Sequence, residues 1–192
     1  MPKIVDREKM QSKILLAFEA CVQNKHISQI TLRDIAAKAN MTHPALLNYF
    51  SSKEEIFSAY CSYTKQYTAE QCVHWFSSHD LSAYPSQLAY MNAFLQYMVE
   101  EYPLQSRPQA AIQTCIMARY NQELQTVIAE EFAFWRETLE RCIKEVYGER
   151  VGEQEAEALI ILIAGLFLCN YSGALTGKIN HNVLSLFQNL LS

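Results

Sequence analysis

The sequence has little glycine and proline, and it has no hydrophobic run long enough to cross a membrane. Only five Gly and five Pro occur among 192 residues, and half of the residues are hydrophobic. An apolar chain with so few turn-forming residues is typical of an all-helical globule with short connections. The longest apolar run extends from Ala158 to Cys169, which is too short for a bilayer, so we predict a buried helix there.

A large excess of charge of one sign is also missing. The net charge is −4, which argues against a protein that coats nucleic acid generally. The charge is uneven, because residues 1–55 hold eight Lys+Arg and six Asp+Glu, whereas the remainder holds eight and fourteen. A mildly basic head on an acidic body suits a protein that touches DNA at one end only. Four early cations could lie near phosphates or could form an ordinary solvated face: Lys3, Arg7, Lys9 and Lys13.

Signatures of secreted proteins and enzymes are absent. The six cysteines form no C-x-x-C pair, and the charged N-terminus does not resemble a signal peptide. We therefore predict a cytoplasmic protein whose thiols are reduced and mostly buried. No Gly-rich phosphate loop, G-x-S-x-G elbow or H-E-x-x-H pair occurs, so we do not expect an enzyme.

One group of residues could offer metal ligands: Cys72, His74, His79 and Asp80. A thiol and an imidazole two positions apart suit a transition metal. However, Cys72 and His74 would project from different sides of a helix, and no second cluster supports them. We predict neither a metal nor a cofactor.

What the chain does contain is a compact pattern of two helices between Thr31 and Phe50. Thr31 is a good N-cap, and Asp34 lies three residues on, where its charge favours a helix start. Apolar residues then recur at helical spacing until Asn40, which tolerates the left-handed conformation of a helix C-terminus. These features predict a short helix that ends at Asn40.

A second short helix should follow at once. Thr42 can cap it, and Pro44 falls in its first turn, where a missing N–H costs little. Leu46 and Phe50 lie four residues apart and would dock this helix on the first one. The pattern is that of a helix-turn-helix, whose second helix must enter a major groove about 12 Å wide. Spacing alone is equally compatible with any helical hairpin in a bundle.

The stretch resembles the DNA-binding signature of the TetR family of transcriptional regulators. The matching elements are T-x-x-x-I-A from Thr31, L-x-x-Y-F ending at Phe50, and S-K-E-E-I-F directly after it. The resemblance covers roughly Ile14 to Phe57. It implies that residues 31–50 are a helix-turn-helix within a DNA-binding domain of residues 1–51, followed by a ligand-binding and dimerisation domain of residues 52–192.

The resemblance also implies which residues contact DNA. His43, Pro44 and Ala45 would face base edges. Candidates for phosphate contacts are Thr31, Arg33, Thr42, Asn48, Tyr49 and Lys53. The sequence departs from the family at Leu47, where a Tyr is usual, and a leucine offers only apolar contact, such as with a thymine methyl group.

The remainder of the chain has the pattern of further helices, about nine in all. We expect them at residues 6–24, 52–76, 85–101, 108–117, 122–147 and 153–175, with a last helix capped by Asn180. Pro85 would lie in the first turn of the helix at 85–101. Gly148 would end the helix at 122–147. The helix at 52–76 would join the two domains.

Large aromatic residues and methionines are numerous in the predicted body. Tyr and Trp combine apolar area with a polar tip, as small-molecule pockets do, although each residue separately could be ordinary core. As a group they predict a cavity for an apolar or aromatic effector. Its candidate lining is Tyr63, Tyr67, Phe94, Met98, Met117, Tyr120, Trp135, Phe167 and Tyr171.

The helix predicted at 153–175 is apolar on nearly every side, and such a helix must be buried all round. We infer that part of it pairs with a second copy of the chain, as the last two helices do in the TetR family. The candidate dimer residues are Leu159, Ile163, Leu166, Val183 and Phe187.

These observations predict a dimeric, ligand-responsive transcriptional regulator. We expect a repressor that binds a near-palindromic operator and is released by a small effector. The alternative is a helical small-molecule-binding or interaction protein without sequence-specific DNA binding.

Overall fold

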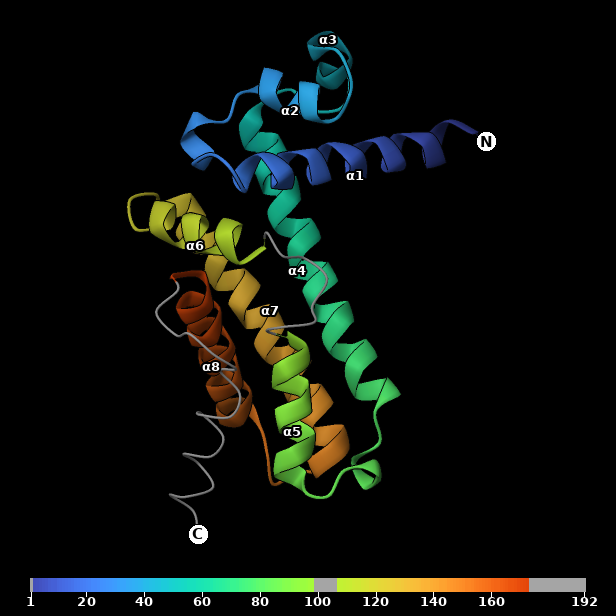
Figure 1. Ribbon diagram of the computed structural model, residues 1–192, viewed down its shortest axis with the longest axis vertical. Coiled ribbons are helices and arrows are strands. Elements are labelled where there is room, and N and C mark those ends of the chain that lie inside the picture. Colours follow the sequence, from blue (N-terminus) through green and yellow to red (C-terminus); the bar gives the residue numbers. More distant parts are fainter. Residues whose placement is uncertain (1, 99–106, 173–192) are drawn as a thin grey trace. The chain divides into compact units, whose positions relative to one another are not determined.

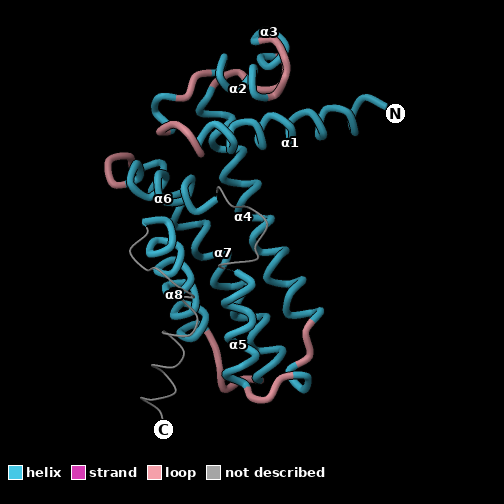
Figure 2. Tube along the Cα trace, in the orientation of Figure 1, coloured by secondary structure: helices cyan, strands magenta, loops and turns pink. Residues whose placement is uncertain are grey.

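The computed structural model describes residues 2–98 and 107–172 (Figure 1). This part of the chain is helical and contains no strand (Figure 2), so the predicted all-helical fold is confirmed. The elements in order are α1 (Pro2–Val22), η1 (Ile27–Gln29), α2 (Leu32–Lys38), α3 (His43–Leu47), α4 (Lys53–Ser78), η2 (Leu81–Ala83), α5 (Gln87–Gln96), α6 (Arg107–Ala118), α7 (Gln122–Tyr147) and α8 (Glu153–Ser172). The helix predicted after Asn180 lies outside the described residues.

The chain forms two compact units. The head unit consists of Met1–Gln66 and Ser106–Gln125, and the body unit of Tyr67–Gln105 and Thr126–Ser192. The head unit therefore contains α1, α2, α3 and α6, and α4 and α7 are each divided between the two units. The predicted DNA-binding domain of residues 1–51 falls entirely within the head unit.

The head unit is organised around a small core of fully buried apolar side chains. Phe18 of α1, Ile35 of α2 and the two anchors that follow, Leu46 and Phe50, all have exposed fractions between 0 and 4%. The Phe18 ring also lies 5.3 Å from the Tyr60 ring, edge on. The sequence-based prediction that Leu46 and Phe50 anchor the second helix is confirmed.

The body unit has a second core, which is mostly aromatic. Side chains from the end of α4 and from α5, α7 and α8 meet there, and Tyr90 and Phe94 are completely buried. The Trp75 ring lies between 4.9 and 5.3 Å from the rings of Phe76, Tyr90 and Phe94. These helices lie beside one another in Figure 1. Burying several such rings contributes favourable free energy to the folding of this unit.

The helix ends agree with their sequence signals except at Pro85. Gly148 adopts a φ of 75° and follows the last residue of α7, as predicted. α5 begins at Gln87, not at Pro85, because the Ser86 side chain accepts a hydrogen bond from the backbone N–H of Ala89 at 3.1 Å. The prediction that Pro85 lies in the first turn is therefore wrong, and the better N-cap determines where the helix starts.

All six cysteines lie in the described residues, and no disulfide joins any of them. Cys61, Cys72 and Cys142 are buried, which matches the expectation, whereas Cys115 is exposed and the remaining two are partly exposed. Burial raises the pKa of the Cys72 thiol to about 12 and that of Cys142 to about 11. Among the helices of residues 2–98 and 107–172, none is long and apolar enough to cross a membrane.

Candidate nucleic-acid interface

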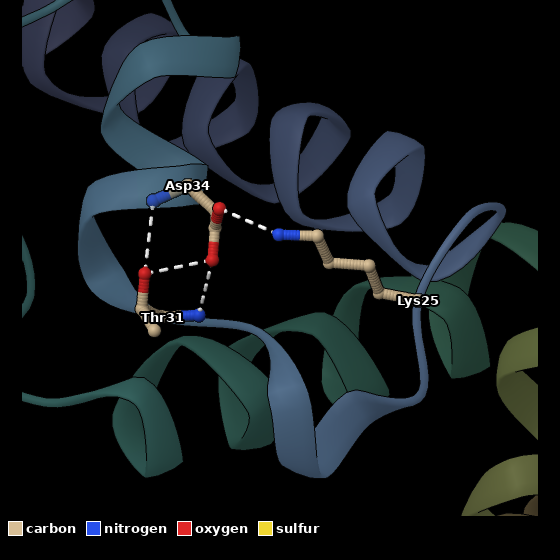
Figure 3. Close-up of polar contacts among 3 residues, drawn as sticks. All are labelled: Lys25, Thr31 and Asp34. Atoms are coloured by element: carbon tan, nitrogen blue, oxygen red, sulfur yellow. Dashed lines mark hydrogen bonds and ion pairs between the residues drawn. The ribbon is translucent and has the colours of Figure 1, made fainter.

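The start of α2 is closed by a reciprocal capping box. The Thr31 hydroxyl accepts from the backbone N–H of Asp34 at 3.2 Å, and Asp34 Oδ2 accepts from the Thr31 backbone N–H at 2.8 Å (Figure 3). The Thr31 hydroxyl also donates to Asp34 Oδ2 at 2.7 Å. The predicted cap is confirmed. Because its proton is donated to Asp34, the Thr31 hydroxyl can offer no hydrogen bond to a phosphate while the box is intact.

Lys25 completes this cluster from the loop after α1. Its Nζ lies 2.8 Å from Asp34 Oδ1 (Figure 3). Hydrogen bonds from Lys25 and Thr31 hold the pKa of the Asp34 carboxyl well below its usual range. The pair is solvent-exposed, so it contributes little by itself, but it orients the carboxylate that caps α2.

The turn between α2 and α3 has the geometry that its sequence indicates. Asn40 adopts a left-handed φ of 53°. The backbone N–H of Met41 donates to the Ala36 carbonyl, and that of Asn40 donates to the Ala37 carbonyl. This is the Schellman arrangement, which satisfies the carbonyl groups at the end of α2. The predicted role of Asn40 is confirmed.

The next helix, α3, starts at His43. The Thr42 hydroxyl accepts from the backbone N–H of Ala45 at 3.3 Å, and Pro44 lies in the first turn, both as predicted. Leu46 faces the core with an exposed fraction of 0%, whereas its neighbour Leu47 is 43% exposed. Leu46 therefore fixes α3 to the head core, whereas Leu47 faces solvent.

The ten predicted DNA contacts all lie in the head unit. Thr31, Arg33, Thr42, Pro44, Leu47 and Asn48 are exposed, and His43, Ala45, Tyr49 and Lys53 are partly exposed. The guanidinium carbon of Arg7, on α1, lies 5.9 Å from the centre of the Tyr49 ring. This contact brings one of the early cations next to the end of α3.

Two carboxylates near this surface, those of Asp34 and Glu55, are engaged at helix starts. Glu55 Oε2 accepts from the backbone N–H and from the hydroxyl of Ser51, at 2.6 and 2.7 Å. These bonds, with a smaller contribution from Arg7, lower the pKa of the Glu55 carboxyl. Ser52 accepts from the Glu55 backbone N–H, so this turn starts α4 as the sequence indicates.

Lys53 is held by the loop before the helix-turn-helix. Its Nζ donates to the carbonyl oxygens of Ile27 and Ser28 at 3.3 and 3.4 Å. An ammonium group has three N–H donors, so one remains for a phosphate. On the other side of this loop, Gln113 Oε1 of α6 accepts from the Ile27 backbone N–H at 2.8 Å. Sequence reasoning missed Lys25 and Gln113, since neither belongs to a local motif and Gln113 is distant in sequence.

The predicted effector residues are divided between the units. Phe94 and Met98 are buried in the body core, and the partly buried Tyr67, Trp135 and Phe167 pack against it. The remaining candidates do not join them: Tyr63, Met117 and Tyr120 belong to the head unit, and the side chain of Tyr171 lies outside the described residues. Tyr120 is 89% exposed because it occupies the turn between α6 and α7.

The predicted dimer residues on α8 face inward. Ile163 and Leu166 are 8% and 5% exposed, and Leu159 packs against the body core. Val183 and Phe187 lie outside the described residues. From Ala158 to Leu168, the exposed residues of α8 are also apolar: Ala158, Ile161, Ala164, Gly165 and Leu168.

Comparisons with known proteins bear on this geometry. Residues 14–60 match the model of the bacterial regulatory proteins of the tetR family. Residues 14–60 therefore form a DNA-binding domain of the TetR type. The match begins on α1 and ends on α4, so it contains the whole helix-turn-helix. No curated protein sequence matches the chain.

Solved structures share the TetR fold over nearly the full length. A TetR-family transcriptional regulator from Rhodococcus sp. superposes with a TM-score of 0.72 at 16% identity, covering 96% of this chain and 100% of that one. A transcriptional regulator from Pseudomonas aeruginosa PAO1 gives 0.71 at 14%, covering 96% and 89%. NalD, the secondary repressor of the MexAB-OprM multidrug efflux pump in Pseudomonas aeruginosa, gives 0.57 at 22%, covering 90% and 89%. The family and the fold support a DNA-binding transcriptional regulator.

Proposed function

We propose that this TetR-family protein is a ligand-responsive repressor that binds a near-palindromic operator as a dimer. The observation that carries the proposal is the capped α2–α3 pair, which buries Leu46 and turns Leu47 and Asn48 outward. The likeness to NalD, whose name describes a repressor, supports repression as the direction of control. The proposal has three parts: DNA contact, dimerisation and release by an effector.

DNA binding can be tested with the duplex upstream of the protein's own gene. Arg33 is an exposed cation on α2 and a candidate phosphate contact. Replacing it with alanine should weaken binding to all sequences alike and reduce the slope of log K against log salt by about 1. Fluorescence anisotropy titrations at several salt concentrations measure both quantities.

Arg141→Ala is the matched control, because Arg141 is an exposed arginine on α7 of the body unit. It should leave the salt slope unchanged. If the unmodified protein prefers no sequence over random duplex, the proposal fails. The alternative, a helical small-molecule-binding or interaction protein, would then be favoured.

Dimerisation is assigned to the outward apolar side of α8. Ile161 and Leu168 are 65% and 52% exposed there, seven residues apart on one helix face. Between them, a Cβ atom added to Gly165 would meet nothing within 4 Å. Small residues flanked by large apolar ones allow two helices to approach closely. A dimer would also place two head units on two half-sites of a near-palindromic operator.

Substitutions on this face test the assignment. Ile161→Arg should convert the dimer to a monomer in sedimentation equilibrium without loss of helical circular dichroism. Gly165→Leu should do the same, since its side chain has room in the single chain. Ile116→Arg is the control, because Ile116 is 57% exposed on α6 of the head unit. A wild-type protein that sediments as a monomer at all concentrations would refute this step.

Release by an effector is assigned to the aromatic cluster of the body unit. Tyr67, Trp135 and Phe167 are only partly buried where they pack against the body core, so all three offer apolar area, and Tyr67 and Trp135 add a polar tip. An apolar or aromatic ligand would bind better to a state whose head units are wrongly spaced for DNA. The affinity for DNA would then fall as the ligand binds.

A screen of small aromatic compounds by thermal shift, followed by DNA titration, tests this step. A compound that raises the melting temperature should lower DNA affinity, and Phe167→Ala should abolish both effects. Tyr120→Ala, which alters an exposed ring of the head unit, should abolish neither. Compounds that stabilise the protein yet leave DNA affinity unchanged would contradict the mechanism.

A further inference from the structure

The outward side of α3 is more apolar than a helix that reads base edges by hydrogen bonds would be. Leu47 is 43% exposed, and Pro44 beside it is also exposed. Ala45 is partly exposed and adds only a methyl group. The fold gains little from Leu47, because the adjacent Leu46 supplies the anchor with its full burial.

The polar side chains of the same helix are less available for base readout. The Thr42 hydroxyl oxygen already accepts from the Ala45 backbone N–H at 3.3 Å. His43, the first residue of the helix, is only partly exposed. Asn48 is exposed, but it lies at the C-terminal end as the C-cap of α3. Hydrogen-bonding groups therefore flank a central surface that offers C–H groups alone.

In the major groove, the C5-methyl group of thymine is the apolar feature that distinguishes one base pair from another. We propose that α3 selects its half-site chiefly through contact of Leu47 with a thymine methyl group, with Pro44 and Ala45 beside it. Leu47, rather than His43, is then the main specificity-determining residue. This inference rests on the proposed DNA-binding function and names what that site recognises.

Charge complementarity favours duplex DNA as the partner of this surface. Arg7 lies 5.9 Å from the Tyr49 ring, close to the end of α3, and Arg33 and Lys38 are exposed on α2. The nearby carboxylate of Glu55 is engaged by Ser51. Cations at the edges would contact phosphates and position the helix, while the apolar centre meets the bases.

The test uses the full-length protein and begins with selection of binding sites from a randomised duplex pool. Each thymine of the enriched half-site is then replaced by deoxyuridine, which removes only the methyl group. At one thymine or more, the affinity of the wild-type protein should fall about threefold to tenfold for each half-site altered, as expected for one buried methyl group. All titrations are made at one salt concentration.

The variant Leu47→Ala should bind the thymine duplex more weakly and should no longer distinguish it from the uracil duplex. Leu16→Ala is the matched control, because Leu16 is a 48% exposed leucine on α1. It should keep the full sensitivity to uracil. Equal melting temperatures for the three proteins would show that all of them fold.

The outcomes separate this inference from the function on which it rests. If the pool yields an enriched sequence but uracil substitution changes nothing at any thymine, the inference is overturned and DNA binding stands. The same holds if Leu47→Ala keeps the sensitivity. If no sequence is enriched, the proposed DNA-binding function fails, and this inference fails with it.

Discussion

In the head unit, the ends of α2 and α3 are closed by short polar bonds, whereas in the body unit the helices meet over a cluster of aromatic rings. The Thr31–Asp34 box and the Thr42 cap each join residues three positions apart. In the body, Trp75 contacts Phe94, which is 19 positions away. Directional bonds fix where each short helix starts, while ring packing fills volume with few directional constraints. Under the proposed function, this difference suits a head that matches a groove and a body that accommodates a ligand.

The largest expected effect comes from the body core. Phe94→Ala should lower the free energy of unfolding by about 3–5 kcal/mol, because it removes a fully buried ring and leaves a cavity. Both tryptophans, Trp75 and Trp135, lie in the body unit, so their fluorescence during urea denaturation reports on this region. Tyr120→Ala, at an 89% exposed position, should change the midpoint little. A small effect of Phe94→Ala would show that the aromatic cluster does not hold the body together.

A slightly smaller effect is expected at the anchor of α3. Leu46→Ala should cost about 2–5 kcal/mol, since Leu46 is fully buried in the head core. Amide hydrogen exchange should show loss of protection in α2 and α3. The neighbouring Leu47→Ala should stay within about 0.5 kcal/mol of the wild type, because the side chain is exposed. Equal effects at the two leucines would contradict the orientation of α3.

The capping box should contribute less than either core. Thr31→Ala removes the oxygen that accepts from the Asp34 backbone N–H and should cost about 1 kcal/mol. Thr31→Ser keeps that oxygen and should retain most of the stability. Thermal unfolding of the three proteins, followed by circular dichroism, measures the difference. An unchanged midpoint for the alanine variant would mean that the cap does not determine the start of α2.

The smallest effect concerns pH. The pKa of Asp34 is lowered in the folded state, first by the hydrogen bond from Lys25, so its ionised form stabilises the head above its ordinary pKa of about 4. That stabilisation is lost progressively as the pH falls below this value. Asp34→Asn should therefore be less stable than the wild type at neutral pH, and the gap should narrow on acidification. Denaturation midpoints of both proteins at pH 7 and pH 3 measure this difference in stability. A difference that widens in acid would refute the stabilising role of the ionised Asp34 carboxylate.

The sequence predicted the local geometry of the helix-turn-helix better than it predicted the body. Thr31, Asn40 and Thr42 all act in the structure as their local patterns indicate. These signals are readable because a cap bond joins residues about three apart, and the residue type alone supplies the donor or the conformation. The effector candidates were chosen only for their large aromatic or methionine side chains, and Tyr120 shows the weakness of that criterion, since it lies in an exposed turn.

The amino-acid sequence by itself determined the helical class, the helix-turn-helix between Thr31 and Phe50, and the two anchors behind it. Tertiary structure alone decided that Gln113 accepts from Ile27, that Lys53 donates to the same loop, and that the outward side of α8 carries Ile161. The physical reason is how far apart the interacting residues lie along the chain. Caps and anchors depend on neighbours in the chain, whereas these contacts depend on which helix faces meet after the chain has folded.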